Sequence, residues 1–205
     1  KACEILDKPV NTRKHEAIIN VSKDGKRIYF YKSIDQGSFY YADLKSDGSW
    51  SKLKPLLDKQ EVNTNAWETS FFGFATTVKD DELFVVSDRD GGVGGRDLYV
   101  SKKKKDGTWG KLENLGSVLN TKYDEDGPYI TPDGNTMYFS SSGHNSMGGF
   151  DLFRSLRVDG NWTEPQNLGA PLNTPGDDVF ITFLHNSDRA CYSSSGYAAD
   201  SSRDM

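Results

Sequence analysis

The chain has 205 residues, a net charge of -5 and an isoelectric point near 5.2, so it lacks the basic balance of a typical nucleic-acid-binding protein. Hydrophobic residues make up 35% of the sequence and aromatic residues 12%, which is enough for a folded core and excludes a disordered tail. No apolar run approaches the ~20 residues that a membrane-spanning helix needs. We therefore expect a folded domain that neither binds nucleic acid nor spans a membrane.

One sequence pattern occurs four times along the chain. Its clearest copies begin with a glycine-rich segment and an aspartate, at 91–98 and 147–152, and continue through an Asp-Gly turn to a tryptophan. The tryptophans that follow these Asp-Gly turns, Trp50, Trp109 and Trp162, are 59 and 53 residues apart, and the fourth tryptophan, Trp67, lies outside the pattern. An Asn-Thr pair marks each unit, at 11–12, 63–64, 120–121 and 173–174. A fixed period of this size indicates stacked or radially arranged structural units.

Each unit predicts four short strands. Two runs rich in aromatic and β-branched residues follow each Asn-Thr pair; in the third unit they are 128–130 and 137–140, joined by the turn 132–134. A third strand follows the glycine-rich segment, and a fourth begins at each tryptophan. Four antiparallel strands in about 50 residues are typical of a β-propeller blade. We predict an all-β fold, a β-propeller with three complete blades and partial ones, part of a larger propeller; closure with four blades stays open.

The predicted organisation is a single β-propeller domain over residues 1–205. Residues 1–12 form the exit of a preceding blade, and the last segment, 175–205, is a partial blade. Complete blades are predicted at 13–64, 65–121 and 122–174.

Three motifs carry a family resemblance: residues 131–141, the Gly-Gly-Phe-Asp-Leu-Phe of 148–153, and the Asn-Leu-Gly-x-x-x-Asn-Thr of 167–174. They resemble WD-like, TolB-type propeller repeats, and more narrowly those of OmpA-family envelope proteins of Bacteroidetes-type bacteria, some of which belong to the type IX secretion and gliding apparatus. The resemblance implies a periplasmic or outer-membrane-associated protein whose partners are other envelope proteins or a peptide segment. It also implies a flanking peptidoglycan-binding domain in the full-length protein. The first unit departs from the pattern at 35–38.

An acidic residue lies five positions after the asparagine of each Asn-Thr pair: Glu16, Glu68, Glu125 and Asp178. Strand parity places these four at one mouth of the central channel. One hypothesis is an acidic rim that binds a basic peptide segment or a cation. The other is structural, in which each carboxylate accepts hydrogen bonds from backbone amides of the neighbouring blade. Repetition in every unit favours the structural hypothesis.

The glycine-rich segment 91–95 is followed by a strand rather than a helix, which excludes a phosphate-binding loop. We expect instead a wide loop between strands that needs positive φ angles. Asp97 and Asp151 are expected to bind the loop backbone in Asx turns. The repeated tryptophans are expected to cover the outer edges of the blades or to pack between blades: Trp50, Trp109 and Trp162.

Nothing in the sequence indicates a catalytic set, a cofactor or a metal site. The three histidines, His15, His144 and His185, share no repeat position. Cys191 aligns with core positions and is predicted to be a small core residue, while a disulfide with Cys3 stays open. The run Lys102–Lys105 lies at a hairpin tip, where a solvated turn is the expectation.

The predicted function is therefore a non-enzymatic scaffold or protein-interaction module of a bacterial envelope protein. Two alternatives remain. One is a carbohydrate-binding or glycan-processing propeller, which predicts paired carboxylates and exposed aromatic residues at one channel mouth. The other is the propeller cap of a peptidase, which requires a hydrolase domain outside this chain.

Overall fold

The computed structural model describes residues 16–22, 24–32, 38–57, 71–76, 81–184 and 189–196. All regular secondary structure in these ranges is β-strand, as the turn-bounded aromatic runs predict. No helix in them is long and apolar enough to cross a membrane.

The strands form four antiparallel sheets, which follow one another along the chain. The first contains β1 (Glu16–Val21), β2 (Arg27–Lys32), β3 (Ser38–Asp43) and β4 (Lys54–Pro55). The second contains β5 (Phe71–Thr76), β6 (Glu82–Ser87), β7 (Asp97–Lys102) and β8 (Glu113–Asn114). The third contains β9 (Glu125–Ile130), β10 (Thr136–Ser141), β11 (Asp151–Val158), β12 (Asn161–Trp162) and β13 (Gln166–Asn167). The last contains β14 (Asp178–Phe183) and β15 (Ala190–Ser194).

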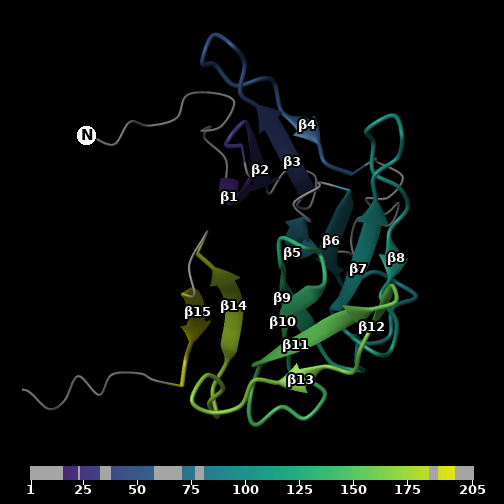
Figure 1. Ribbon diagram of the computed structural model, residues 1–205, viewed down its shortest axis with the longest axis vertical. Helices are drawn as coiled ribbons and strands as arrows, with labels where there is room; N and C mark the ends of the chain where they lie inside the picture. Colours follow the sequence, from purple (N-terminus) through teal and green to yellow (C-terminus); the bar gives the residue numbers. More distant parts are fainter. Residues whose placement is uncertain are drawn as a thin grey trace, which may run out of the picture.

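The sheets are arranged as blades around a common centre. The first strand of each sheet is innermost, and β1, β5, β9 and β14 contact each other in that order. Figure 1 shows the resulting open arc, from β1–β4 through β5–β8 and β9–β13 to β14–β15. The four sheets have four, four, five and two strands, because the outer position of the third sheet is divided between β12 and β13. They confirm the predicted propeller architecture. The exact blade boundaries stay a prediction.

In the first two blades the outermost strand differs from its prediction, because regular pairing does not start at the tryptophan. Trp109 forms only an isolated bridge with Lys103, and β8 begins at Glu113. Between them the hydroxyl of Ser101 donates to the carbonyl of Gly110 over 2.8 Å, so a side chain replaces a backbone bond. In the third blade the tryptophan is in a regular strand, since Trp162 lies in β12 and pairs with Arg157. The hydroxyl of Ser155 then donates to the carbonyl of Thr163 over 2.6 Å, and the outer position is divided between β12 and β13.

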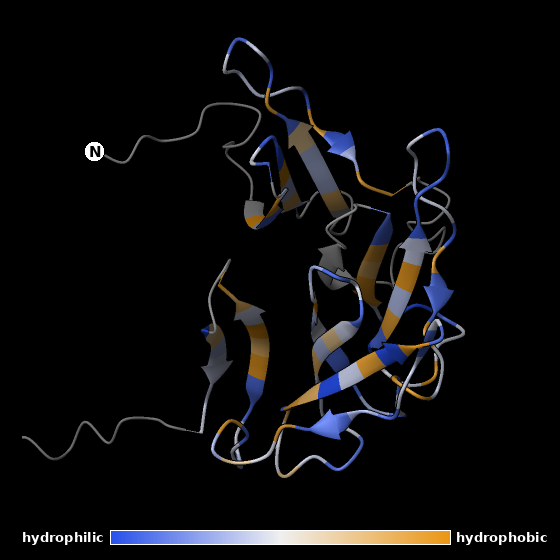
Figure 2. Cartoon of the chain, viewed as in Figure 1, coloured by the Kyte–Doolittle hydropathy of each residue, from blue (hydrophilic) through white to orange (hydrophobic). Residues whose placement is uncertain are grey.

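Two apolar cores join neighbouring blades, and the alternating hydropathy along the strands in Figure 2 reflects them. The first core joins the first two blades through Tyr29, Phe39, Leu56, Leu57, Leu83, Val85, Tyr99, Trp109 and Leu112. The second core joins the second and third blades through Phe84, Val86, Leu98, Val100, Leu119, Ile130, Met137, Phe139 and Phe153. The ring of Trp162 lies 6.2 Å from that of Phe84. Trp109 and Trp162 therefore pack between blades. Trp50 packs against a third cluster, formed by Ile28, Phe30 and Ala42 of the first blade.

Cys191 corrects one prediction, since it is exposed with a free thiol rather than buried in a core. Its strand, β15, pairs only with β14 among the described residues, so nothing described covers the outer side of this sheet. Cys3 lies outside the described residues.

Candidate partner-binding face

The repeated loops gather at one end of the blades. Because neighbouring strands are antiparallel, the loops from second to third strand and from each blade to the next lie at the same end. These loops are 88–96, 115–124, 142–150 and 168–177, and we call their surface the loop face. The hairpin tips at 44–49, 103–109, 131–135 and 158–160 form the opposite face.

Asp97 and Asp151, the first residues of β7 and β11, accept hydrogen bonds from backbone amides of the preceding glycine-rich loops. Asp97 is fully buried and accepts hydrogen bonds from the amides of Val93, over 2.5 Å, and Gly94, over 3.2 Å. Asp151 accepts from the amide of Met147 over 2.7 Å. The predicted bond to the loop backbone is present, but it reaches back three and four residues. It is therefore not an Asx turn, in which the bond runs forward along the chain.

Two asparagines, Asn114 and Asn120, extend the hydrogen-bond network of Asp97. Asn114 donates to Asp97 over 2.9 Å and accepts from Asn120 over 2.9 Å. Asn120 in turn accepts from the amide of Leu98 and donates to its carbonyl, over 2.8 and 3.0 Å. Its side chain thus replaces a backbone partner beside β7, a role that the sequence motif did not reveal.

The third blade repeats this network residue for residue. Asn167 donates to Asp151 over 2.8 Å, and Asn173 donates to Asn167 over 2.7 Å. Asn173 also makes both backbone bonds to Leu152. In the second and third blades, the two asparagines of the Asn-Leu-Gly-x-x-x-Asn motif therefore bind the outer strand to the third strand of the same blade.

Glu125 opens the inner strand β9 and is fully buried. Its carboxylate accepts hydrogen bonds from the amide and hydroxyl of Thr121, over 2.9 and 2.7 Å, and from the hydroxyl of Ser141 over 2.7 Å. Burial raises the pKa of Glu125 to about 7, against the opposing effect of these bonds. The carboxylate thus holds the linker between blades onto the inner strand.

Asp178 takes the same place in the last blade, with one methylene less. It accepts from the amide and hydroxyl of Thr174, over 2.6 and 2.9 Å. Ser194 lies opposite it, as Ser141 lies opposite Glu125. The shorter side chain leaves one buried oxygen, Oδ1, without a hydrogen-bond partner among the described residues. Both described members of the predicted acidic rim are therefore buried in structural contacts.

The side chains of the other two predicted members are outside what the structure describes. Glu16 opens β1 opposite Lys32, but the structure does not describe its side chain, and Glu68 lies outside the described residues. In the second blade, Phe71 pairs with Ser87, where Glu125 and Asp178 pair with their serines. The hydroxyl of Ser87 is buried without a described partner. The binding role of the acidic rim stays a prediction.

Glycines let the linkers cross directly over the loops. A Cβ on Gly94 would overlap backbone atoms of Thr121 and Lys122, and one on Gly148 would overlap the backbone of Pro175. Of the five residues 91–95, only Gly91 has a positive φ, of 82°. The predicted positive φ is present at Gly91, whereas the later glycines of the loop serve close backbone approach.

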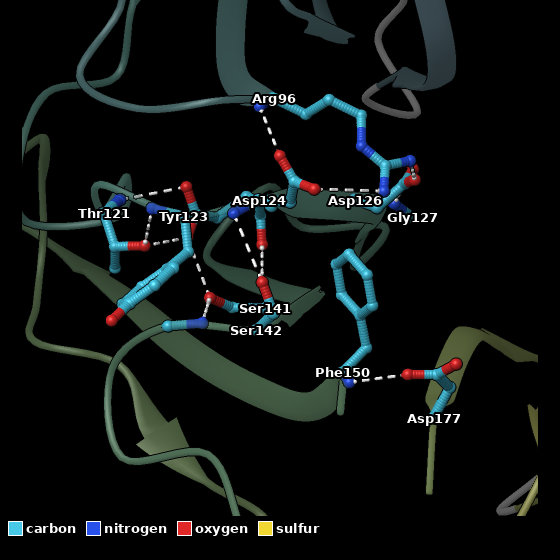
Figure 3. Close-up of polar contacts among 12 residues, drawn as sticks. Arg96, Thr121, Tyr123, Asp124, Asp126, Gly127, Ser141, Ser142, Phe150 and Asp177 are labelled. Atoms are coloured by element: carbon cyan, nitrogen blue, oxygen red, sulfur yellow. Dashed lines mark hydrogen bonds and ion pairs between the residues drawn. The ribbon is translucent and has the colours of Figure 1, made fainter. Parts of the chain in front are cut away.

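Arg96 departs from the repeat and was not singled out from the sequence. Its amide donates to Asp124 over 2.8 Å, and its guanidinium donates to the buried Asp126 over 2.5 Å (Figure 3). Phe150, the matching residue of the next blade, lies 5.3 Å from the guanidinium, and its own amide donates to Asp177 over 3.0 Å. Burial raises the pKa of Asp126, and the Arg96 charge opposes this. The sequence signal that could have predicted this ion pair is that Arg96 and Asp126 occupy positions where the next repeat has Phe150 and Val179.

Apolar side chains are exposed on the loop face. They come from four different loops: Val93 (41% exposed), Val118 (37%), Tyr123 (51%), Met147 (49%) and Leu172 (37%). By contrast, His144 is engaged in the structure, since its Nε2 lies 3.0 Å from the carbonyl of Leu119 and its ring contacts Phe139 and Phe153. No three histidine, cysteine or acidic side chains in the described ranges are placed to hold a metal.

No protein-family model matches the chain, and no curated protein matches it. Solved structures do share its fold. A putative TolB from Agrobacterium tumefaciens superposes with a TM-score of 0.53 at 16% identity, over 77% of this chain and 50% of that one. TolB from Acinetobacter baumannii gives 0.50 at 12%, over 89% and 41%. A puromycin hydrolase S511A mutant complexed with PGG gives 0.53 at 16%, over 87% and 28%.

The sheets and these similarities define the class of protein as an all-β propeller. Within that class, the chain has a TolB-like β-propeller fold. It spans half the length, or less, of the proteins compared above. At such identities the likeness extends to the fold alone, since one propeller fold hosts unrelated activities.

Proposed function

We propose that the chain is a non-enzymatic propeller scaffold that binds other proteins through its loop face. The observation that supports this is that the repeated polar residues of that face are buried, whereas apolar residues of its loops are exposed. The motif residues Asp97, Asn120 and Glu125 are buried in hydrogen bonds within the chain, whereas apolar side chains from four loops are exposed. Exposed apolar groups gathered over several loops suit a protein interface.

The setting that we propose is the bacterial envelope. The TolB-like fold supports a periplasmic scaffold at this coarse level. The repeat motifs support the narrower proposal of an OmpA-family protein, associated with the outer membrane and type IX secretion, with a peptidoglycan-binding domain elsewhere in the full-length protein. Partners would be other envelope proteins or a peptide segment. In this proposal the buried carboxylates of Glu125 and Asp178 fix the linkers that the partner contacts.

Site-specific photocrosslinking in cells tests this proposal. A photoreactive amino acid at Tyr123 or Met147 should give adducts of discrete mass in the envelope fraction. The same amino acid at Asp133 or Asp159, on the opposite face, should give few. Equal crosslinking from both faces, or none from the loop face, would contradict the proposal.

A second candidate is the propeller cap of a larger hydrolase, favoured by the similarity to puromycin hydrolase. It requires a catalytic domain in the full-length protein, which mass determination of the native protein followed by a peptidase assay would reveal. A glycan-binding propeller is the third candidate. It calls for carboxylates that a sugar can reach, and Glu125 and Asp178 are both buried. Binding in a glycan screen that is lost in Tyr123→Ala would nevertheless support it.

A further inference from the structure

The hairpin between β7 and β8 concentrates positive charge on an acidic protein. Residues 102–111, which we call the basic hairpin, contain five lysines and one aspartate, a net charge of +4 on a chain of net charge -5. The lysines are Lys102, Lys103, Lys104, Lys105 and Lys111. The matching hairpin of the first blade, 43–52, has two lysines and two aspartates and is neutral. This charge is therefore not a feature of the repeat.

Most of this charge is not neutralised by the fold. Lys102, Lys104, Lys105 and Lys111 are exposed and form no ion pair with any described residue. The single carboxylate at the tip, Asp106, accepts from the amide and hydroxyl of Thr108, over 2.9 and 2.6 Å. Neighbouring like charges repel, so the lysine run does not stabilise the hairpin.

The hairpin is nevertheless well ordered by other contacts. The amide of Lys104 donates to the carbonyl of Thr108 over 2.7 Å, and the amide of Gly107 donates back to Lys104 over 2.9 Å. The ammonium of Lys103 lies 5.2 Å from the ring of the buried Trp109. The four exposed lysines thus lie on a hairpin with an ordered backbone, whose tip Figure 1 shows beyond the end of β7 and Figure 2 shows as hydrophilic.

The shape and chemistry of the tip discriminate between anionic partners. A site for a single anion needs donors that converge in a concavity, whereas this tip is convex. A glycan is recognised largely by exposed aromatic faces, and the one aromatic residue of the hairpin, Trp109, is buried. Lysines are compact point charges that need no bidentate geometry, and clusters of them are attracted to anionic lipid surfaces. We propose that the basic hairpin docks on an anionic phospholipid surface, with the loop face pointing away from it.

Vesicle co-sedimentation tests this inference with a matched control. The wild-type chain should bind vesicles of phosphatidylcholine mixed with phosphatidylglycerol at low salt, and not vesicles of phosphatidylcholine alone. Each lysine near such a surface contributes about fivefold in partitioning. The partitioning of the double variant K102Q/K105Q should therefore be about 25-fold weaker. The variant K45Q/K52Q, in the first blade, changes the net charge equally and should bind almost as the wild type does.

Raising the salt should release the wild-type chain, because charges more than a Debye length of about 8 Å apart are screened near physiological ionic strength. Thermal unfolding of both variants checks that they remain folded. Absence of wild-type binding to the anionic vesicles would overturn the proposal, and so would an equal loss in the two variants. Binding to the loop-face partner does not depend on this outcome, so the two proposals fail separately.

Discussion

The guanidinium of Arg157 on β11 donates to both carboxylate oxygens of Glu82 on β6, over 2.7 and 2.9 Å. This bidentate pair joins the third blade to the second at the hairpin-tip end. Both side chains are largely covered, with 24% and 13% of their surface exposed, and the guanidinium also lies 5.3 Å from the ring of Trp162. The pair therefore covers the core between these two blades at its hairpin-tip end.

Removal of the Glu82 charge should loosen this junction. In Glu82→Gln, Arg157 keeps its charge but loses its bidentate carboxylate partner in a partly buried site, which should lower the free energy of unfolding by about 1–3 kcal/mol. Urea denaturation measures the change. The matched control is Arg154→Gln, which removes an exposed bond to Gln166 and should cost less than about 0.5 kcal/mol. Equal midpoints for the two variants would show that the pair contributes nothing.

The two uses of glycine in the fold make separable predictions. Gly94→Ala places a Cβ against the backbone of Thr121 and Lys122, which cannot move without shifting the linker, and should cost about 2–3 kcal/mol. Gly107→Ala meets open space but has a φ of 83°, so it should cost only about 1 kcal/mol. Thermal unfolding of both variants orders them. A larger loss in Gly107→Ala would contradict the close-approach explanation.

Asn120 should be far more sensitive than an exposed asparagine. Its replacement by alanine leaves the amide and carbonyl of Leu98 and the side chain of Asn114 short of partners in a buried site, at a cost of about 2–4 kcal/mol. Asn161→Ala removes one long, exposed bond to Asp159 and serves as the control. Chemical denaturation should separate the two variants clearly, and similar stabilities would refute the proposed role of the network.

The repeat pattern was sufficient to predict the fold because each level of the sequence agrees with it. Turn residues, short aromatic runs and the regular tryptophans all indicate four-stranded blades, and the sheets confirm this. The roles of the motif residues were harder to predict. Asp97 was expected to bind the loop backbone and does so, but the partners of Asn114 and Asn120 depend on strands far apart along the chain, which spacing does not reveal.

The irregular second blade shows where periodic reasoning fails. Eleven positions separate Asn114 from Glu125, and eleven separate Asn167 from Asp178, whereas sixteen separate the matching Pro55 and Phe71. Counting from the Asn-Thr pair selects Glu68, which lies outside the described residues, whereas the residue that pairs with Ser87 is Phe71. The Arg96–Asp126 contact was not predicted, because a repeat pattern does not reveal a contact that occurs at a single blade junction of the described chain.

Glu125 couples the stability of the linker to pH. Burial raises its folded-state pKa to about 7, above the ordinary value of 4.5. Between these values the folded protein holds a proton that the unfolded chain releases. Its contribution to stability is therefore fully present below about pH 4.5 and is lost as the pH rises toward 7. The shift corresponds to roughly 3 kcal/mol at most.

The variant Glu125→Gln should abolish this dependence. The amide can accept from the backbone of Thr121 and donate to the hydroxyls of Thr121 and Ser141, which resembles the protonated carboxyl group. Urea midpoints of both proteins, measured from pH 4.5 to pH 8, isolate the effect, because all other titrating groups are common to the two. The stability of the wild type relative to the variant should fall by up to roughly 3 kcal/mol over this range. Parallel profiles would mean that Glu125 ionises in the folded protein as readily as in the unfolded chain.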